Sequence, residues 1–316
     1  MHVLAAPDKF RGTLTAREAA AAVVAGAARA GWTATELPLA DGGEGTLAVL
    51  GGGNRRTTVT GPLGVPVEAE WHLEEDGTAI VEAALACGLT LAGGPERNDP
   101  LAATSRGVGE LVAAAIAEGA ARVVVAVGGV ASTDGGVGAV EALPSPLPVP
   151  LDVACDVDAR LLDAADVFAP QKGATPEQVL ILRERLTKLS LPDLPGSGAA
   201  GGLGGGLAAV GARLIPGFDL VAERVGFDEH LARADLVVTG EGRIDATSFT
   251  GKVVGRVLDR AAAAGIEALV VAGEVAPDSP SAALSLVERY GPESAFADPA
   301  KCLMELAGIA LATRRN

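Results

Sequence analysis

Short apolar runs that end in glycine and acidic residues constrain the fold of this chain more than any other feature of its sequence. The runs at residues 3–6, 123–127 and 236–239 alternate with longer, alanine-rich stretches of helical periodicity. Such alternation is typical of α/β proteins with parallel strands. Residues 55–82 differ, because short strand-like segments follow one another there with only glycine-containing turns between them. We therefore expect an α/β protein that has parallel strands and one antiparallel patch.

The charge and the cysteine content narrow the classes of partner. The net charge is −15, which argues against nucleic acid and anionic membranes, since both bind basic surfaces. The three cysteines are far apart and form no CxxC pair, a pattern typical of a reducing compartment. The sequence shows neither a signal peptide nor an apolar stretch of membrane-spanning length. We expect a cytoplasmic protein without nucleic-acid or membrane partners.

Polar residues cluster directly after the predicted strands. Residues 7–9, 41–46, 132–136 and 240–245 combine glycines with carboxylates and a lysine. In open parallel sheets, ligands bind at the carboxyl ends of the strands. Glycine-rich loops can turn backbone N–H groups toward a phosphate, and carboxylates become compatible with that phosphate when Mg²⁺ lies between them. This mixture suits phosphoryl transfer, although the same residues also serve simple turns.

The common nucleotide-binding motifs are absent from the sequence. No GxxxxGK[ST] loop occurs, since Gly251 and Lys252 are followed by Val253. The glycine run at residues 198–206 follows no clear strand and is a poor dinucleotide fingerprint. If the chain binds ATP, it does so with another arrangement.

Eight stretches, taken together, resemble the bacterial glycerate kinase family of the glycerate 2-kinase kind. They occur in family order and cover nearly the whole chain: APDKFRGTLT at 6–15, PLADGGEGT at 38–46, ATSRGVGEL at 103–111, GGVASTDGG at 128–136, VACDV at 153–157, APQKGATP at 169–176, GSGAAGGLG at 196–204, and TGEGRID at 239–245 followed by GK at 251–252.

The resemblance implies a two-domain α/β fold. A flavodoxin-like parallel-sheet domain is formed by both chain ends, residues 1–55 plus 226–316, and an inserted mixed α/β domain spans residues 56–225. The active site is expected in the cleft between them. The implied activity is ATP- and Mg²⁺-dependent phosphorylation of D-glycerate to 2-phosphoglycerate rather than 3-phosphoglycerate. A small-molecule substrate and a homodimer are the expected partners.

The strand-end pattern and the resemblance together indicate the site residues. The catalytic candidates are Lys9, Asp41, Asp134 and Lys172. Substrate or phosphate contacts are expected from Asp8, Arg11, Gly42, Gly43, Glu44, Thr46, Ser105, Gly135, Gly136, Gln171, Gly173 and Lys252. Metal ligands are expected at Asp156, Glu241 and Asp245, because carboxylate oxygens suit Mg²⁺.

Each of these positions also has a structural interpretation. Lys9 is then a solvated lysine, Asp41 and Asp134 cap turns, and Lys172 leads into a helix. Arg243 lies between Glu241 and Asp245 in the sequence and offers an ion pair instead of a metal site.

The chain also departs from the family pattern. The segment between Gly138 and Val153 is much shorter than usual and contains a proline-rich connection, and the residues at Val130 and Ala159 differ from the usual ones. Two alternatives follow. One is a kinase for another small hydroxy acid, and the other is a non-catalytic descendant that binds a nucleotide or metabolite.

Overall fold

The protein is described by a computed structural model that covers residues 1–10, 12–277, 279 and 283–314. The chain divides into two compact units. Met1–Asp41 and Phe218–Asn316 form unit 1, and Gly42–Gly217 form unit 2. The expected α/β fold with two sheets is confirmed. Arg11, a predicted contact residue, lies outside the described residues.

Unit 1 contains a five-stranded sheet in which every pair of strands is parallel. Its strands are β1 (His2–Ala5), β2 (Thr33–Glu36), β9 (Leu236–Ile244), β10 (Glu267–Val275) and β11 (Leu284–Ser285). The spatial order is β2-β1-β9-β10-β11. Numbered along the chain within this unit, that order is the flavodoxin-like one, whose switch point lies between β1 and its partner β9.

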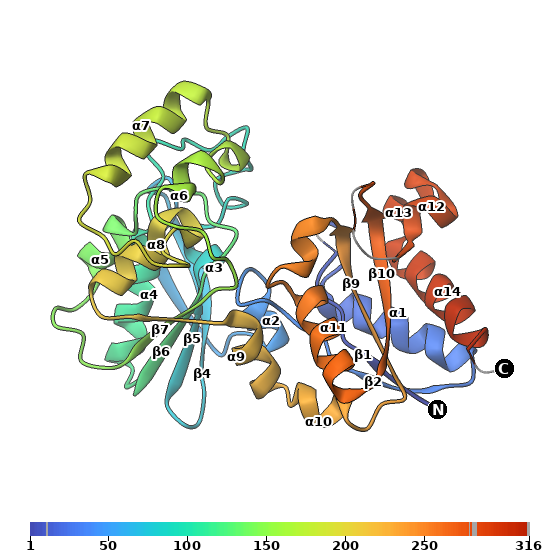
Figure 1. Ribbon diagram of the computed structural model, residues 1–316. Coiled ribbons are helices and arrows are strands. Elements are labelled where there is room, and N and C mark those ends of the chain that lie inside the picture. Colours follow the sequence, from blue (N-terminus) through green and yellow to red (C-terminus); the bar gives the residue numbers. More distant parts are fainter. Residues whose placement is uncertain (11, 278, 280–282, 315–316) are drawn as a thin grey trace. The chain divides into compact units, whose positions relative to one another are not determined.

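Helices cover both faces of this sheet (Figure 1). Leu269 and Val271 of β10 point into the core shared with α1 (Ala16–Arg29) and α14 (Pro299–Ala312), whereas Val270 and Ala272 pack with α11 (Val253–Ala264) on the other face. The alternation follows from the two-residue period of a strand. The remaining helical segments are α9 (Gly217–Arg224), α10 (Phe227–Leu231), η2 (Ala246–Phe249), α12 (Leu286–Tyr290) and α13 (Pro292–Ala297).

Unit 2 contains a six-stranded mixed sheet in the order β3-β4-β5-β6-β7-β8. The strands are β3 (Arg55–Thr60), β4 (Pro66–Leu73), β5 (Thr78–Glu82), β6 (Arg122–Ala126), β7 (Leu151–Ala154) and β8 (Arg213–Ile215). β3, β4 and β5 pair antiparallel, and the later pairs are parallel. The predicted antiparallel patch is therefore confirmed.

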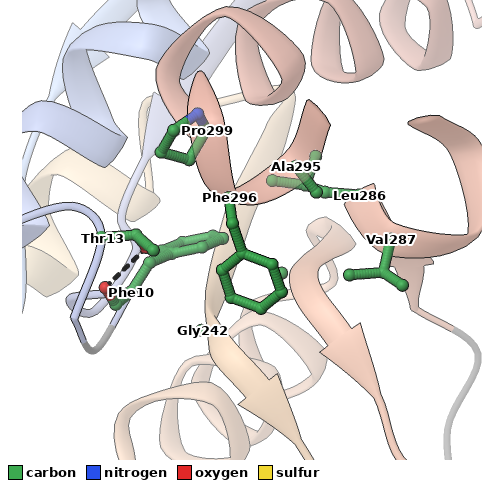
Figure 2. Close-up of a pocket in the computed structure, with 9 residues that line it drawn as sticks. Phe10, Thr13, Gly242, Leu286, Val287, Ala295, Phe296 and Pro299 are labelled. Carbon is green, nitrogen blue, oxygen red and sulfur yellow. Dashed lines mark hydrogen bonds between the residues drawn. The ribbon is translucent and has the colours of Figure 1, made fainter. Parts of the chain in front are cut away.

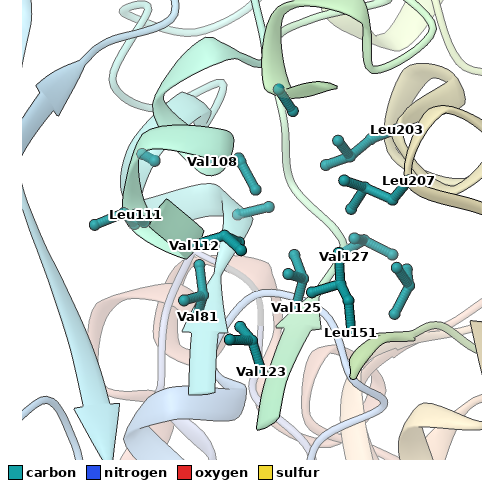
Figure 3. Close-up of a cluster of buried hydrophobic side chains, with 14 of the residues drawn as sticks. Val81, Val108, Leu111, Val112, Val123, Val125, Val127, Leu151, Leu203 and Leu207 are labelled. Atoms are coloured by element: carbon teal, nitrogen blue, oxygen red, sulfur yellow. The ribbon is translucent and has the colours of Figure 1, made fainter. Parts of the chain in front are cut away.

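The core of unit 2 lies between this sheet and its helices (Figure 3). Val123 and Val125 of β6 pack with Val108 and Leu111 of α4 (Arg106–Ala117), and Leu203 and Leu207 of α8 (Ala199–Ala209) belong to the same cluster. The other helical segments are α2 (Thr46–Val49), α3 (Ala83–Cys87), α5 (Val137–Ala142), α6 (Asp163–Asp166), η1 (Pro170–Lys172) and α7 (Pro176–Thr187).

The unit boundaries differ from the predicted domain ranges. Residues 42–55, which were expected in the flavodoxin-like domain, belong to unit 2, and residues 218–225, which were expected in the inserted domain, belong to unit 1. Residues 42–49 pack in unit 2 because the N–H groups of Gly45 and Leu47 donate to Glu82 of β5. The second strand along the chain, β2, ends at Glu36. Its pairing continues for a short distance, since Leu37 N donates to the Ala5 carbonyl at 2.8 Å. None of the helices among the described residues is both long and apolar enough to cross a membrane.

Candidate active site

A charged cluster lies at the switch point of the unit 1 sheet. Asp8 follows β1, and its N–H donates to the carbonyl of Gly240 on β9 at 2.9 Å. The Asp8 side chain is only 6% exposed. Its Oδ1 accepts a hydrogen bond from Lys9 N at 2.6 Å and lies 3.8 Å from Lys9 Nζ. The sheet thus brings Asp8 and Lys9 next to the end of β9.

The carboxylates of this cluster influence one another. Burial raises the pKa of Asp8 to about 7; Lys9 opposes this rise, and the negative charges of Asp41 and Glu241 add to it. Burial also raises the pKa of Glu241, with smaller contributions from Asp245 and Asp41. Three carboxylates with mutual repulsion at a strand-end site are typical of a position that receives a cation or a proton.

Glu241 is the best candidate metal ligand of the three predicted. Its Oε1 is buried and has no hydrogen-bond partner among the described residues. A buried acceptor without a partner is costly, and a hard cation such as Mg²⁺ would satisfy it. Within the described parts of the chain, no three His, Cys, Asp or Glu side chains form a ready metal cluster. The three predicted ligands Asp156, Glu241 and Asp245 therefore do not form such a group among the described residues.

Asp245 and Lys252 have local structural partners. Asp245 caps η2, since its Oδ1 accepts from Thr247 N at 2.8 Å and from Thr247 Oγ1 at 2.6 Å. Hydrogen bonding from Thr247 lowers the pKa of Asp245. Lys252 Nζ donates to Thr247 Oγ1 at 2.9 Å. Arg243 pairs with Glu274 at 4.0 Å. Asp245 therefore has a capping role, and the charges of both Asp245 and Lys252 act on the nearby Glu241.

Asp156, the third predicted metal ligand, belongs to unit 2. Its Oδ1 accepts from the N–H of Gly217, at the start of α9, at 2.9 Å. Gly217 in turn touches Gly42, because a Cβ at position 42 would lie 2.6 Å from Gly217 Cα. Asp156 thereby fixes the backbone where the chain leaves unit 2, and this hydrogen bond is a structural role that the sequence did not indicate.

The loop at residues 42–46 is held by a residue that the sequence analysis missed. Glu82 ends β5, is 3% exposed, and accepts from Gly45 N at 2.9 Å and from Leu47 N at 2.9 Å. Thr46, predicted as a contact residue, is fully buried. The only sequence signal for Glu82 is a carboxylate at the end of a short apolar strand.

Asp134 and Ser105 form one hydrogen-bonded network in unit 2. Asp134 Oδ2 accepts from both the N–H and the Oγ of Ser105 at 2.8 Å, and its Oδ1 accepts from Gly136 N at 3.1 Å. Ser105 Oγ accepts from Ala139 N at 3.1 Å. The network links the beginnings of α4 and α5. These bonds favour the capping interpretation of Asp134 over a catalytic one.

Lys172 is a buried lysine, 7% exposed. Its Nζ donates to the Ser132 carbonyl at 2.5 Å and lies 3.4 Å from Thr133 Oγ1. Burial lowers the pKa of Lys172 to about 8, whereas nearby Cys87 and Asp134 oppose that shift. Lys172 therefore ties η1 to the loop that carries Asp134.

Several predicted glycines are needed for close backbone packing. Gly135 and Gly136 have φ values of +69° and +75°, and a Cβ at position 136 would lie 3.1 Å from Leu203 Cα in α8. Gly173 has φ +90°, and a Cβ there would lie 2.1 Å from the Pro95 carbonyl oxygen. Gln171 is exposed. The structure places these four residues in unit 2.

A small apolar pocket of about 30 Å³ opens in unit 1 beside the ends of β9 and β10 (Figure 2). Its walls include Phe10, Gly242, Gly273, Phe296 and Pro299. Phe296 is 62% exposed, whereas Phe10 is buried. Two of its lining residues, Phe10 and Gly242, directly follow Lys9 and Glu241 in the sequence.

The fold and the charged switch-point cluster together define an α/β protein with carboxylates and a lysine gathered beside β1 and β9 of its parallel sheet. The sequence model of the Glycerate kinase family matches residues 3–148 and 144–307. The chain belongs to the glycerate kinase family, and it is accordingly a member of a family of kinases, that is, of phosphotransferases.

Relatives from several bacteria support this assignment. A glycerate 2-kinase of Escherichia coli is 37% identical over 80% of this chain and 80% of its own length. A glycerate kinase of Bacillus subtilis is 38% identical over 88% of this chain and 86% of its own length. A solved structure from Salmonella typhimurium LT2, named as a candidate glycerate kinase 2, superposes with a TM-score of 0.77 at 32% identity and covers 100% of this chain and 98% of its own.

Proposed function

We propose that the protein transfers the γ-phosphoryl group of ATP to the 2-hydroxyl of D-glycerate, in the presence of Mg²⁺, to give ADP and 2-phosphoglycerate. The observation that carries this proposal is the cluster of Asp8, Lys9, Asp41 and Glu241 at the switch point, found in a chain of the glycerate kinase family. Phosphoryl transfer needs cationic groups, a divalent metal and a carboxylate at one site, and this cluster supplies residues of the required types.

Each residue of the cluster has a distinct proposed role. Lys9, whose side chain is 26% exposed, can reach an anionic group of the substrate while Asp8 orients its ammonium. Asp41 is proposed to orient the acceptor hydroxyl and to accept its proton. Glu241, with its unsatisfied buried Oε1, is the proposed metal ligand. When bound, Mg²⁺ would neutralise charge on the transferring phosphate.

The proposed setting follows from the charge of the chain. With a net charge of −15, it is suited to a small-molecule substrate rather than to nucleic acid or anionic membrane. We propose that it acts in the cytoplasm, as a homodimer.

The proposal is tested by identifying the product and by comparing the rates with different acceptors. Purified protein is incubated with ATP-Mg and a panel of small hydroxy acids, and the product is identified by ³¹P and ¹³C NMR. We expect 2-phosphoglycerate from D-glycerate and slower turnover of the other acids. A different best acceptor would replace glycerate as the substrate, and a phosphate on the 3-hydroxyl would correct the position of transfer.

A lysine variant tests the role of the cluster. We expect Lys9→Met to lower kcat/KM by about 100-fold, since an ammonium on a transferring phosphate is commonly worth a few kcal/mol. Lys188→Met is the matched control, because Lys188 is 71% exposed and pairs only locally with Glu184. Equal activity of the two variants would contradict the role of Lys9.

A further inference from the structure

Glu82 is a carboxylate from the sheet that occupies the start of a helix in another part of unit 2. Gly45, the residue before α2, has φ +94° and no side chain with which to cap the helix. Glu82 takes over this task from the end of β5, with one carboxylate oxygen on Gly45 N and the other on Leu47 N, both at 2.9 Å. A negative charge at a helix start satisfies N–H groups that have no partner within the helix.

The same loop is also held by the neighbouring strand. Glu82 pairs in register with Ala126 of β6, so Gly128 and Gly129 emerge beside it. A Cβ at position 128 would lie 2.8 Å from Gly43 Cα, and one at position 129 would lie 3.1 Å from Glu44 Oε2. Residues 43–46 therefore lie against glycines on one side and are hydrogen-bonded to a buried carboxylate on the other.

These hydrogen bonds change which groups of residues 42–47 can contact a substrate. Because Glu82 already occupies Gly45 N and Leu47 N as an internal anion, a substrate phosphate would not take those two amides. What the loop can present is the half-buried Glu44, since Gly42, Gly43 and Thr46 are buried. The placement of these groups depends on a side chain that cannot itself reach solvent, since Glu82 is 3% exposed.

We propose that Glu82 is a positioning residue of the phosphoryl-transfer reaction, which fixes residues 43–46 for binding and orienting the hydroxy-acid acceptor. This inference rests on the proposed kinase function. It predicts an effect on acceptor kinetics, because displacement of a substrate-positioning loop by a fraction of an ångström lowers the rate without unfolding the protein.

The test compares two glutamate variants of unit 2. Glu82→Gln replaces one acceptor oxygen with a donor that opposes an N–H group. Glu110→Gln is the control, because Glu110 also accepts from a backbone N–H, that of Thr60 at 2.7 Å, and from Thr60 Oγ1 and Arg106 Nε, both at 3.0 Å, but joins α4 to β3. In E82Q we expect kcat/KM for the acceptor to fall by at least about tenfold while KM for ATP is unchanged. In E110Q we expect a similar change in Tm with unaltered kinetic constants.

The outcomes distinguish the positioning role of Glu82 from the proposed kinase function. Equal kinetic constants in E82Q and wild type, or equal losses in E82Q and E110Q, would overturn the role of Glu82 and leave the kinase function intact. If the wild type uses another hydroxy acid, only the choice of glycerate fails, and the comparison is made with that acid. If the wild type phosphorylates no acceptor, both are wrong. Should E82Q not fold, Glu82→Asp keeps the charge with a shorter reach, and a smaller fall in the same kcat/KM is expected.

Discussion

At the scale of single residues, burial of the Asp8 carboxyl makes the stability of the protein depend on pH. Its pKa is about 7 in the folded chain, against an ordinary value of 3.8, chiefly because the carboxyl is buried. Between these two values the folded protein keeps the proton that the unfolded chain releases. The free energy of unfolding contributed by Asp8 therefore decreases as pH rises from about 4 to about 7, and stays at its lower value above that range.

Replacement of Asp8 by Asn should stabilise the protein at high pH only. The amide oxygen can still accept from Lys9 N, and the buried charge is removed. We expect the free energy of unfolding to be higher in D8N by about 2 kcal/mol at pH 8 and to be equal to wild type at pH 4.5. Urea unfolding at the two pH values measures this difference. A difference that does not depend on pH would mean that Asp8 is ionised at both.

Gly42 illustrates a backbone requirement at the residue scale. It has φ +80°, and a Cβ there would lie 2.6 Å from Gly217 Cα. We expect Gly42→Ala to lower the free energy of unfolding by about 3 kcal/mol, because both backbone strain and a clash with main chain are introduced. Gly51→Ala is the control, since Gly51 has φ +104° with open space around it, and should cost about 1 kcal/mol. Equal losses in chemical denaturation would show that the contact with Gly217 does not matter.

At the scale of secondary structure, elements with local signals were predictable. Capping boxes of Thr15 with Glu18 and of Thr175 with Gln178 start α1 and α7. Asp298 caps the last helix, α14. These signals lie within four residues of one another, so the sequence alone contains them. The contacts of Glu82 could not be predicted in this way, because its partners Gly45 and Leu47 lie on a distant segment of the chain.

The helix in the glycine-rich run at residues 198–206 could not be predicted from local signals. Residues Ala199–Ala209 form α8, although glycine disfavours helices and Ala200, Gly201 and Gly202 adopt left-handed conformations within it. A Cβ at position 206 would lie 2.4 Å from the Gly135 carbonyl oxygen. The glycines let one backbone pack against another, and this tertiary requirement overrides local propensity.

The parallel half of the unit 2 sheet depends on one buried carboxylate. Asp152 of β7 is fully buried and accepts from Arg122 Nε of β6 at 2.5 Å and from Arg213 Nε of β8 at 2.8 Å. We expect Asp152→Ala to lower the free energy of unfolding by about 2 kcal/mol, a value reduced because both arginines are partly exposed. Arg213→Ala, at the 67% exposed partner, should lower the free energy of unfolding by less than Asp152→Ala does. Equal losses in urea unfolding would contradict a central role for Asp152.

At the scale of the whole molecule, the α/β class and the position of Asp8 and Lys9 shortly after β1 followed from the sequence pattern. Glu241 was expected in a loop after a strand at residues 236–239 and instead lies within β9, because that strand continues to Ile244. The flavodoxin-like order of the unit 1 sheet did not follow from the sequence pattern, because it joins strands from both ends of the chain and was inferred from family resemblance. The family model matches two segments of the chain, which overlap at residues 144–148. The overlap lies within the proline-rich connection, where the chain was expected to be shorter than the usual family pattern.

The central claim is that this chain uses ATP to phosphorylate glycerate, and ADP release tests it most directly. Purified protein is supplied with ATP-Mg, with and without D-glycerate, and with EDTA as the metal-free control. The account predicts rapid ADP release that requires both glycerate and Mg²⁺, at roughly the 1–100 s⁻¹ typical of kinases. ADP release at the same low rate with and without glycerate would contradict it.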